Sequence, residues 1–204
     1  MIEITSPTLV VMFSGGLDSL GALYKALTDS TYSQYAIHVH HIHLKNYEDR
    51  DAAEDIAVAA ILEAIKKIPT LKEPTISYST FTFPDINKGV LIDAIVVNFI
   101  AGNLIQRFPF IQKVALGVTK DDDINTRDIT AANQAVALFA LFSDTAAKVY
   151  PVRTMSKQEI YDMLPVDLRK LAWYCRTPNK VNDKYIPCGG CHSCIAMIEI
   201  TRVK

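Results

Sequence analysis

The sequence predicts an α/β protein with a doubly wound parallel sheet, because short apolar runs alternate with longer segments of helical periodicity. Two of these runs, residues 8–13 and 113–118, are too apolar for a half-exposed strand and are typical of strands buried on both faces. The chain has 204 residues, of which 50% are hydrophobic. That length suffices for one large domain, or for one domain with a small appendage.

The first half of the chain predicts three strands and two helices. The β-branched run at 8–13 gives the first strand, and the leucine spacing over 19–27 gives the helix that follows. The segment 35–44 predicts a second strand. An alanine-rich amphipathic helix follows over 48–68, with acidic residues early and lysines late, as the helix dipole favours. The alternating segment 75–83 predicts the third strand.

The second half continues the alternation up to a cysteine-bearing tail. Ser156 and Glu159 form a predicted capping box that opens a helix through Met163. The tail from about residue 165 has no strand signal, so we expect a nucleotide-binding α/β domain over 1–165 and a helical metal-binding tail over 166–204. The other elements expected here are a helix ending near 107, a strand at 113–118, a helix at 130–142 and a strand at 148–152.

Charge and hydropathy exclude several classes of partner. The formal net charge is −1, from 21 basic and 22 acidic side chains, and this predicts no nucleic-acid partner and no membrane partner. The most apolar segment, 89–105, is interrupted by Asp93, Asn98 and Asn103, which favours a buried helix over a membrane span. The first residues lack the pattern of a signal peptide, so we expect a cytoplasmic protein.

The stretch "SGGLDS" follows the first strand directly and predicts a phosphate-binding loop. Gly15 and Gly16 allow close approach of a ligand to backbone N–H groups, and the following helix adds its free N–H groups. Ser14 and Ser19 add hydroxyl donors. A carboxylate next to a polyphosphate repels it unless Mg²⁺ lies between, so Asp18 is a candidate magnesium ligand. The alternative is an ordinary turn in which Asp18 or Ser19 only caps the helix.

The four cysteines lie together in an otherwise cysteine-free chain and predict a metal site. Cys188, Cys191 and Cys194 form a C-x-x-C-x-x-C run, and Cys175 precedes it. Four thiolates at this spacing can surround one tetrahedral Zn²⁺ and leave no position for a catalytic water, which favours a structural role. An iron–sulfur centre is the alternative, because spacing alone does not determine the metal.

Two further polar segments are candidates for the nucleotide site. In "HVHHIH", His38 and His40 share one face of a strand while His41 and His43 share the other, so a four-histidine metal site is not expected. His43, at the end of the strand, is a candidate neighbour of the adenine.

The acidic segment "KDDDINTRD" follows another buried strand and reaches the same edge of the sheet as the glycine-rich turn. There Lys120 could stabilise charge developing on phosphate, and Asp122 could bind Mg²⁺. A solvated loop is the alternative. Arg153 and Lys157 are weaker candidates.

The motif S-G-G-x-D-S after the first strand resembles the pyrophosphate-binding loop of the N-type ATP pyrophosphatases, whose fold is adenine nucleotide alpha hydrolase-like. Together with the four cysteines, with "ALGVTKDDD" and with "WYC", it resembles the 7-cyano-7-deazaguanine synthase family over nearly the whole chain. The resemblance implies a homodimeric ligase that uses ATP, Mg²⁺ and ammonia to convert 7-carboxy-7-deazaguanine into a nitrile, with Zn²⁺ in the tail. It implies catalytic residues Asp18, Lys120 and Asp122, and ATP-binding residues Phe13, Ser14, Gly15, Gly16, Leu17, Asp18, Ser19, His43 and Gly117.

Several family motifs differ here. The family's Q-x-H after the second strand is Glu48-x-Arg50, its P-G-R-N before the long helix has no counterpart, and its P-D-C-R is reduced to "INTRD", which contains Arg127. Two other functions therefore remain: a related enzyme that adenylates a different carboxylate or base, and a nucleotide-binding protein without catalysis.

Overall fold

The central strand of the computed structural model, β1 (Thr8–Met12), is buried along its whole length. The structure describes residues 4–45, 50–82, 93–124, 137–142 and 146–202. Successive side chains of a strand point to opposite faces, and here both faces are covered. Leu9 and Val11 belong to one hydrophobic core, and Val10 and Met12 belong to a second. The apolar run of the sequence therefore forms a strand with two buried faces, as predicted.

Five parallel strands form the sheet in the order β3-β2-β1-β4-β5. The chain builds outward from β1 to β2 and β3, then returns to add β4 and β5 on the other side of β1. In open α/β sheets, ligands bind at the carboxyl ends of the strands where the order reverses, which here is between β1 and β4. The strands are β1, β2 (Ala36–Lys45), β3 (Thr75–Thr82), β4 (Ile111–Ala115) and β5 (Ala147–Val149).

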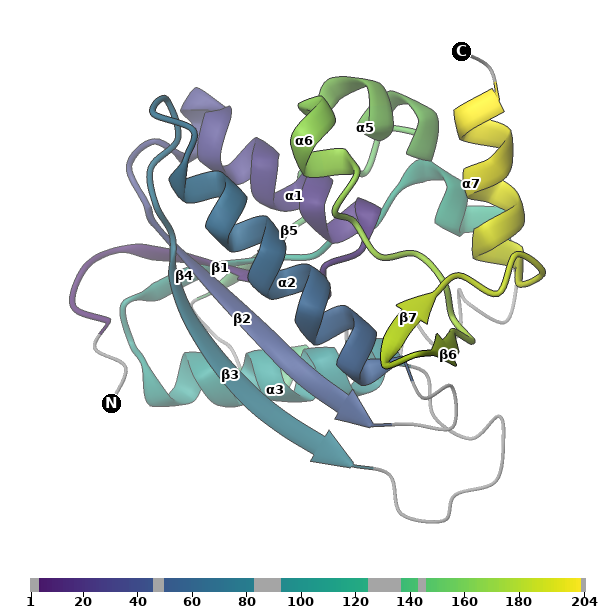
Figure 1. Ribbon diagram of the computed structural model, residues 1–204. Coiled ribbons are helices and arrows are strands. Elements are labelled where there is room, and N and C mark those ends of the chain that lie inside the picture. Colours follow the sequence, from purple (N-terminus) through teal and green to yellow (C-terminus); the bar gives the residue numbers. More distant parts are fainter. Residues whose placement is uncertain (1–3, 46–49, 83–92, 125–136, 143–145, 203–204) are drawn as a thin grey trace.

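Helices cover both faces of the sheet (Figure 1). The first core lies between the sheet and the helices α1, α2, α5 and α6, and the second lies under α3 and Phe139. The predicted doubly wound parallel fold is confirmed. The helices are α1 (Leu17–Thr28), α2 (Asp51–Lys66), α3 (Asp93–Arg107), α5 (Lys157–Met163), α6 (Val166–Arg169) and α7 (His192–Arg202), with short 3₁₀ turns η1 (Ser30–Tyr32) and η2 (Lys120–Ile124).

The capping box predicted for α5 is present. The Ser156 hydroxyl accepts from the backbone N–H of Glu159, and the Glu159 carboxylate accepts from the backbone N–H of Ser156. For the helix expected at 130–142, residues 137–140 are helical and 130–136 lie outside the described residues, as do Glu48 and Arg127. Among the described residues, no helix has the length and apolarity needed to cross a membrane.

The tail contains strands that the sequence pattern did not predict. An antiparallel hairpin, β6 (Asn179–Val181) with β7 (Lys184–Ile186), lies between Cys175 and Cys188. Asn182 and Asp183 join its strands with positive φ angles of 47° and 59°. Two consecutive residues of this kind form the tight turn that matches the twist of a hairpin. The three-residue strands are too short to show an alternating pattern, so the Asn-Asp pair was the available signal.

The packing of α1 against α5 gives a test of this fold. At Gly21 a Cβ atom would lie 2.6 Å from Ile160 Cγ2 and 3.3 Å from Val152 Cγ1, and both neighbours are fully buried. Gly21→Ala should lower the free energy of unfolding by about 1 kcal/mol, because the overpacking exceeds the gain in helix propensity. Urea unfolding measures the change. Gly190→Ala is the matched control, since its Cβ would meet no atom within 4 Å, and a Gly21→Ala variant more stable than the parent would contradict this packing.

Candidate functional site

The loop between β1 and α1 forms a cradle of donors at the carboxyl end of the sheet. The Ser19 hydroxyl donates to the Gly16 carbonyl at 3.0 Å and lies 3.1 Å from the Ser14 hydroxyl. The backbone N–H of Gly16 donates to Ser14 Oγ at 3.3 Å. These contacts fold the loop over the first turn of α1, where backbone N–H groups have no partner within the helix. The loop therefore has the donors and the dipole that bind phosphate.

Two glycines make this loop possible. Gly15 has φ +76°, a conformation that favours glycine, and a Cβ there would lie 3.1 Å from Val58 Cγ2 on α2. Gly117, just after β4, approaches the start of α1 so closely that a Cβ would lie 2.6 Å from the backbone of Asp18 and Ser19. Both positions exclude a side chain, so the loop is held between α2 and the end of β4.

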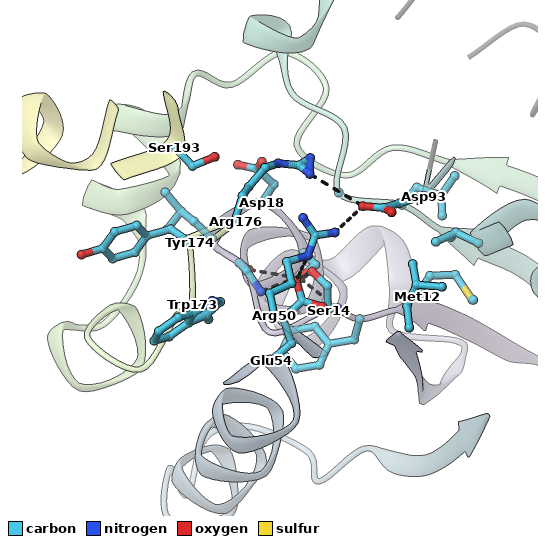
Figure 2. A pocket seen from close by; sticks show the side chains of 18 of the residues that line it. Met12, Ser14, Asp18, Arg50, Glu54, Asp93, Trp173, Tyr174, Arg176 and Ser193 are labelled. Atoms are coloured by element: carbon cyan, nitrogen blue, oxygen red, sulfur yellow. Dashed lines mark hydrogen bonds and ion pairs between the residues drawn. The ribbon is translucent and has the colours of Figure 1, made fainter. Parts of the chain in front are cut away.

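A cavity of about 380 Å³ opens from this loop. Met12, Ile42 and Leu44 give it an apolar wall, and Trp173 and Tyr174 from the tail line it as well (Figure 2). Such an apolar cavity with a few convergent polar groups is typical of a small-molecule site. Seven of the predicted ATP-binding residues line it: Phe13, Ser14, Gly16, Leu17, Asp18, Ser19 and Gly117.

Asp18, in the first turn of α1, places its carboxyl group in the cavity beside the loop. Its Oδ2 accepts a hydrogen bond from Lys157 Nζ, while its buried Oδ1 has no partner within the described part of the chain. Burial raises the pKa of Asp18; Lys157 opposes this effect, and Asp122 and Asp121 add to it. An unpaired buried carboxylate oxygen near further carboxylates fits Mg²⁺, which prefers oxygen ligands.

Lys120 and Asp122 do not line the cavity. Lys120 Nζ donates to Glu159 at 2.8 Å on the exposed side of α5. Asp122 Oδ2 accepts from the backbone N–H of Thr119 at 2.7 Å, and its Oδ1 lies 3.9 Å from Lys157 Nζ. The lysine that contacts Asp18 is therefore Lys157, which was a weaker candidate from the sequence than Lys120. Lys120 lies in η2, which directs its side chain toward Glu159 of α5.

A cluster of four charged side chains also lines the cavity near the loop, where three segments that are distant in the sequence meet. Arg50, just before α2, donates to Asp93 at the start of α3, and its Nε donates to Glu54 at 2.8 Å. Arg176 Nη1 lies 3.7 Å from the same Asp93 oxygen. All four line the cavity, and Figure 2 shows both guanidinium groups directed at Asp93. Two arginines converging on one carboxylate form a subsite suited to an anionic group.

The histidines alternate between the faces of β2 as predicted. His38 and His40 contact hydroxyls of β3, and Ser77 Oγ lies 2.7 Å from a ring nitrogen of each. His40 lines the cavity, whereas His43 does not. The His43 ring lies between Asp51 and Asp55 of α2, at 3.0 and 2.7 Å, so the structure does not bring the candidate adenine neighbour into the cavity.

The four cysteine sulfurs converge in the tail, all within 4.8 Å of one another. Cys188 Sγ and Cys194 Sγ are 3.9 Å apart. A tetrahedral ion with metal–sulfur bonds of about 2.3 Å holds its sulfurs about 3.8 Å apart. In a four-iron cluster each cysteine binds a different iron, which places the sulfurs farther apart. The spacing therefore fits a single tetrahedral metal ion.

The surroundings of these sulfurs suit thiolate ligands. The backbone N–H of Cys188 donates to Cys175 Sγ at 3.2 Å, and that of Cys191 donates to Cys188 Sγ at 3.3 Å. Hydrogen bonds from the Thr177 hydroxyl and from backbone N–H groups lower the pKa of Cys188 to about 6. Gly189, with φ +75°, allows the turn between the first two cysteines of the run.

Sequence reasoning missed the part that the tail plays in the cavity. Cys175, Arg176, His192 and Ser193 all line it, so the segment with the cysteines forms one wall of the cavity. The available signal was adjacency: Trp173 and Tyr174 directly precede Cys175, and Arg176 directly follows it.

No family model matches the sequence, and a comparison with curated proteins finds no significant match. Among solved structures, the chain is similar to the U34-tRNA thiolase NcsA from Methanococcus maripaludis with its 4Fe–4S cluster, at 15% sequence identity and a TM-score of 0.49. The match covers 98% of this chain and 65% of that one, so the chain spans less than two thirds of its length. A likeness this distant carries no conclusion about function.

The cysteine geometry predicts the stoichiometry of the bound metal. Protein purified without chelators should contain one metal ion per chain and no inorganic sulfide, because the sulfurs surround a single position. Elemental analysis and a sulfide assay measure both quantities. Cys188→Ser should lose the ion, while Ser193→Ala, in the same segment, should keep it. Four irons and four sulfides per chain would show that the site holds a cluster.

Proposed function

We propose that this chain is an ATP-dependent enzyme that adenylates a carboxylate and transfers the acyl group to ammonia, in the manner of 7-cyano-7-deazaguanine synthase. The observation that carries the proposal is the unpaired, buried Asp18 Oδ1 in the cavity, at the end of a phosphate-binding loop. A carboxylate in this position repels polyphosphate unless a divalent cation lies between them. The loop and Asp18 together therefore favour Mg²⁺-bound ATP as the ligand.

The reaction proceeds through two adenylations. A carboxylate oxygen of 7-carboxy-7-deazaguanine attacks the α-phosphorus of ATP, and the bond to pyrophosphate breaks. Ammonia displaces AMP from the acyl adenylate and, after losing a proton, gives the amide. The amide oxygen attacks a second ATP, releasing a second pyrophosphate. That oxygen then departs with AMP, and the nitrogen loses its two remaining protons to leave the nitrile.

Five side chains would serve the nucleotide end of this reaction. The hydroxyls of Ser14 and Ser19 would donate to phosphate oxygens, and for this the Ser19 proton would turn from the Gly16 carbonyl to the phosphate. Lys157 Nζ, which reaches Asp18 at the edge of the loop, can turn to the phosphates and stabilise the charge that develops as pyrophosphate leaves. Asp18 would hold Mg²⁺, which neutralises phosphate charge when bound, with Asp122 nearby. The four cysteines would hold Zn²⁺ in a structural role.

Arg50 and Arg176 would bind the acid. The carboxylate of the substrate and the phosphates of ATP are both negative and repel each other when they are close. Cations beside the carboxylate are therefore needed to reduce this repulsion. The two arginines supply them, and Asp93 between them occupies the position that the carboxylate of the substrate would take. We further propose a cytoplasmic homodimer with no nucleic-acid partner.

The proposal predicts pyrophosphate release and nitrile formation from ATP, ammonia and 7-carboxy-7-deazaguanine. Pyrophosphate assays and mass spectrometry follow the two products. Pyrophosphate released only with another acid would identify a different acceptor. ATP binding without pyrophosphate release, with every acid tried, would show a nucleotide-binding protein without catalysis.

Asp18→Asn removes the charge that would hold Mg²⁺ and should lower kcat for pyrophosphate release by about 100-fold or more. Asp167→Asn, on the exposed side of α6, is the matched control and should keep full activity. An Asp18→Asn enzyme with unchanged turnover would contradict the role given to Asp18.

Arg176→Gln should separate the acid subsite from the ATP site. We expect KM for the acid to rise about tenfold or more, because a charge-assisted contact to its carboxylate is lost, while the Kd for ATP changes little. Initial-rate kinetics and calorimetry measure the two constants. Arg202→Gln, exposed on α7, is the control. A rise in the Kd for ATP with no change in KM for the acid would place Arg176 at the nucleotide instead.

A further inference from the structure

A second cluster of charged groups lies behind the phosphate loop, between β2 and α2. Its members are His41 and His43 on β2 and Asp51 and Asp55 on α2, and none of them lines the cavity. His41 Nδ1 lies 2.7 Å from the Phe13 carbonyl oxygen, and its Nε2 lies 2.8 Å from Asp55 Oδ1. His43 Nδ1 lies 2.7 Å from Asp55 Oδ2, and its Nε2 lies 3.0 Å from Asp51 Oδ2.

The partner of a ring nitrogen determines whether that nitrogen donates. A neutral imidazole has one donor and one acceptor nitrogen, whereas a carbonyl oxygen only accepts. His41 Nδ1 faces the Phe13 carbonyl oxygen, so this nitrogen carries a proton and donates it to that oxygen. His38 and His40 differ, because their hydroxyl partners can both donate and accept, which suits neutral rings.

Other groups around His41 do not compete for these contacts. Tyr78 of β3 packs its ring edge-to-face against His41, with centroids 6.1 Å apart. His40, its neighbour on β2, points to the other face of the sheet, and burial lowers the pKa of His40 to about 4, which keeps that ring neutral. The carboxylates of α2 therefore provide the charge that His41 faces.

The contact with Phe13 connects this cluster to the phosphate loop. The backbone N–H of Phe13 donates to the His40 carbonyl at 2.9 Å, and the Phe13 carbonyl accepts from His41. Because a peptide group is planar, fixing the Phe13 carbonyl also fixes the direction of the Ser14 N–H, which donates to Ser19 Oγ at 3.3 Å. The same helix that carries Asp55 also packs against Gly15. Helix α2 thus fixes the orientation of the backbone at the start of the loop, at Phe13–Ser14 through His41 and at Gly15 by packing.

We propose that His41 is a positioning residue for the phosphate loop: its ring is oriented by Asp55, and its Nδ1–H fixes the Phe13–Ser14 peptide for nucleotide binding. This role rests on the proposed function in so far as the loop binds ATP. His43 links Asp55 to Asp51 and completes the cluster. The position of one peptide, and with it the affinity of the loop, then depends on the hydrogen bond of one histidine behind the sheet.

Two substitutions at His41 separate its two contacts. His41→Asn keeps an amide donor close to the place of Nδ1 and can still reach the Phe13 carbonyl. His41→Gln extends the amide toward Asp55 and loses the Phe13 contact. We expect the Kd for ATP with Mg²⁺, measured by calorimetry, to rise about tenfold in His41→Gln, equivalent to about 1.4 kcal/mol. In His41→Asn the rise should stay within about threefold.

The matched controls are His38→Asn and His38→Gln. His38 is a buried histidine of the same strand whose two ring nitrogens each lie 2.7 Å from a hydroxyl of β3, and it does not line the cavity. Its substitution should lower Tm and leave the Kd for ATP unchanged. Equal losses of affinity in both His41 variants, or the same loss in the His38 variants, would overturn the positioning role and leave a structural one.

Nitrogen NMR of the unsubstituted protein tests the position of this proton directly, without ATP and without a variant that has to fold. Nδ1 of His41 should carry a proton and donate it to the Phe13 carbonyl. An unprotonated Nδ1 on His41 would overturn the proposal. Failure of the parent protein to bind ATP would instead defeat the proposed function, whereas the NMR result would still decide the state of the cluster.

Discussion

The close backbone approach around the loop from Ser14 to Ser19 is the constraint on which the site depends. Gly117 presses against the start of α1, Gly15 packs on α2, and the backbone N–H of Trp173 donates to the Gly15 carbonyl at 2.9 Å. The loop is therefore held by a strand end, a helix and the tail. None of these contacts depends on a long side chain, so backbone packing alone sets the shape of the loop. A preorganised loop lowers the entropy that binding must overcome.

The cations near the loop of the cavity are paired with carboxylates of the chain. Lys157 pairs with Asp18, and Arg50 and Arg176 share Asp93. In an apolar cavity such ions would be unfavourable alone, and their mutual contacts satisfy them. An anionic ligand that took over the cations would remove these partners from Asp18 and Asp93, so another cation or solvent would have to compensate the two carboxylates. The same cations can thus stabilise the fold and contact a ligand.

The sequence revealed the local features of this protein better than the distant ones. The glycine-rich loop, the capping box of α5 and the cysteine spacing are short patterns whose geometry is set by neighbouring residues, and the structure contains all three. The choice of Lys157 over Lys120 depends on how η2 packs on α5, which no local pattern reports. The same holds for Arg176, whose position follows from the cysteines folding back on the sheet, and for His43, which α2 draws away from the cavity.

The order of the strands also determines when the cavity is completed. β1 pairs with β2 from residue 36 and with β4 only from residue 111, and the tail wall extends to Met197. During synthesis from the N-terminus, β1 can pair with β2 and pack against α2 long before β4 and the tail exist. Gly117 and Trp173, which hold the other sides of the loop, come only with those later segments. A ligand that reached the nascent chain early would therefore meet an unfinished cavity, and tight binding would follow only after the tail has folded onto the sheet.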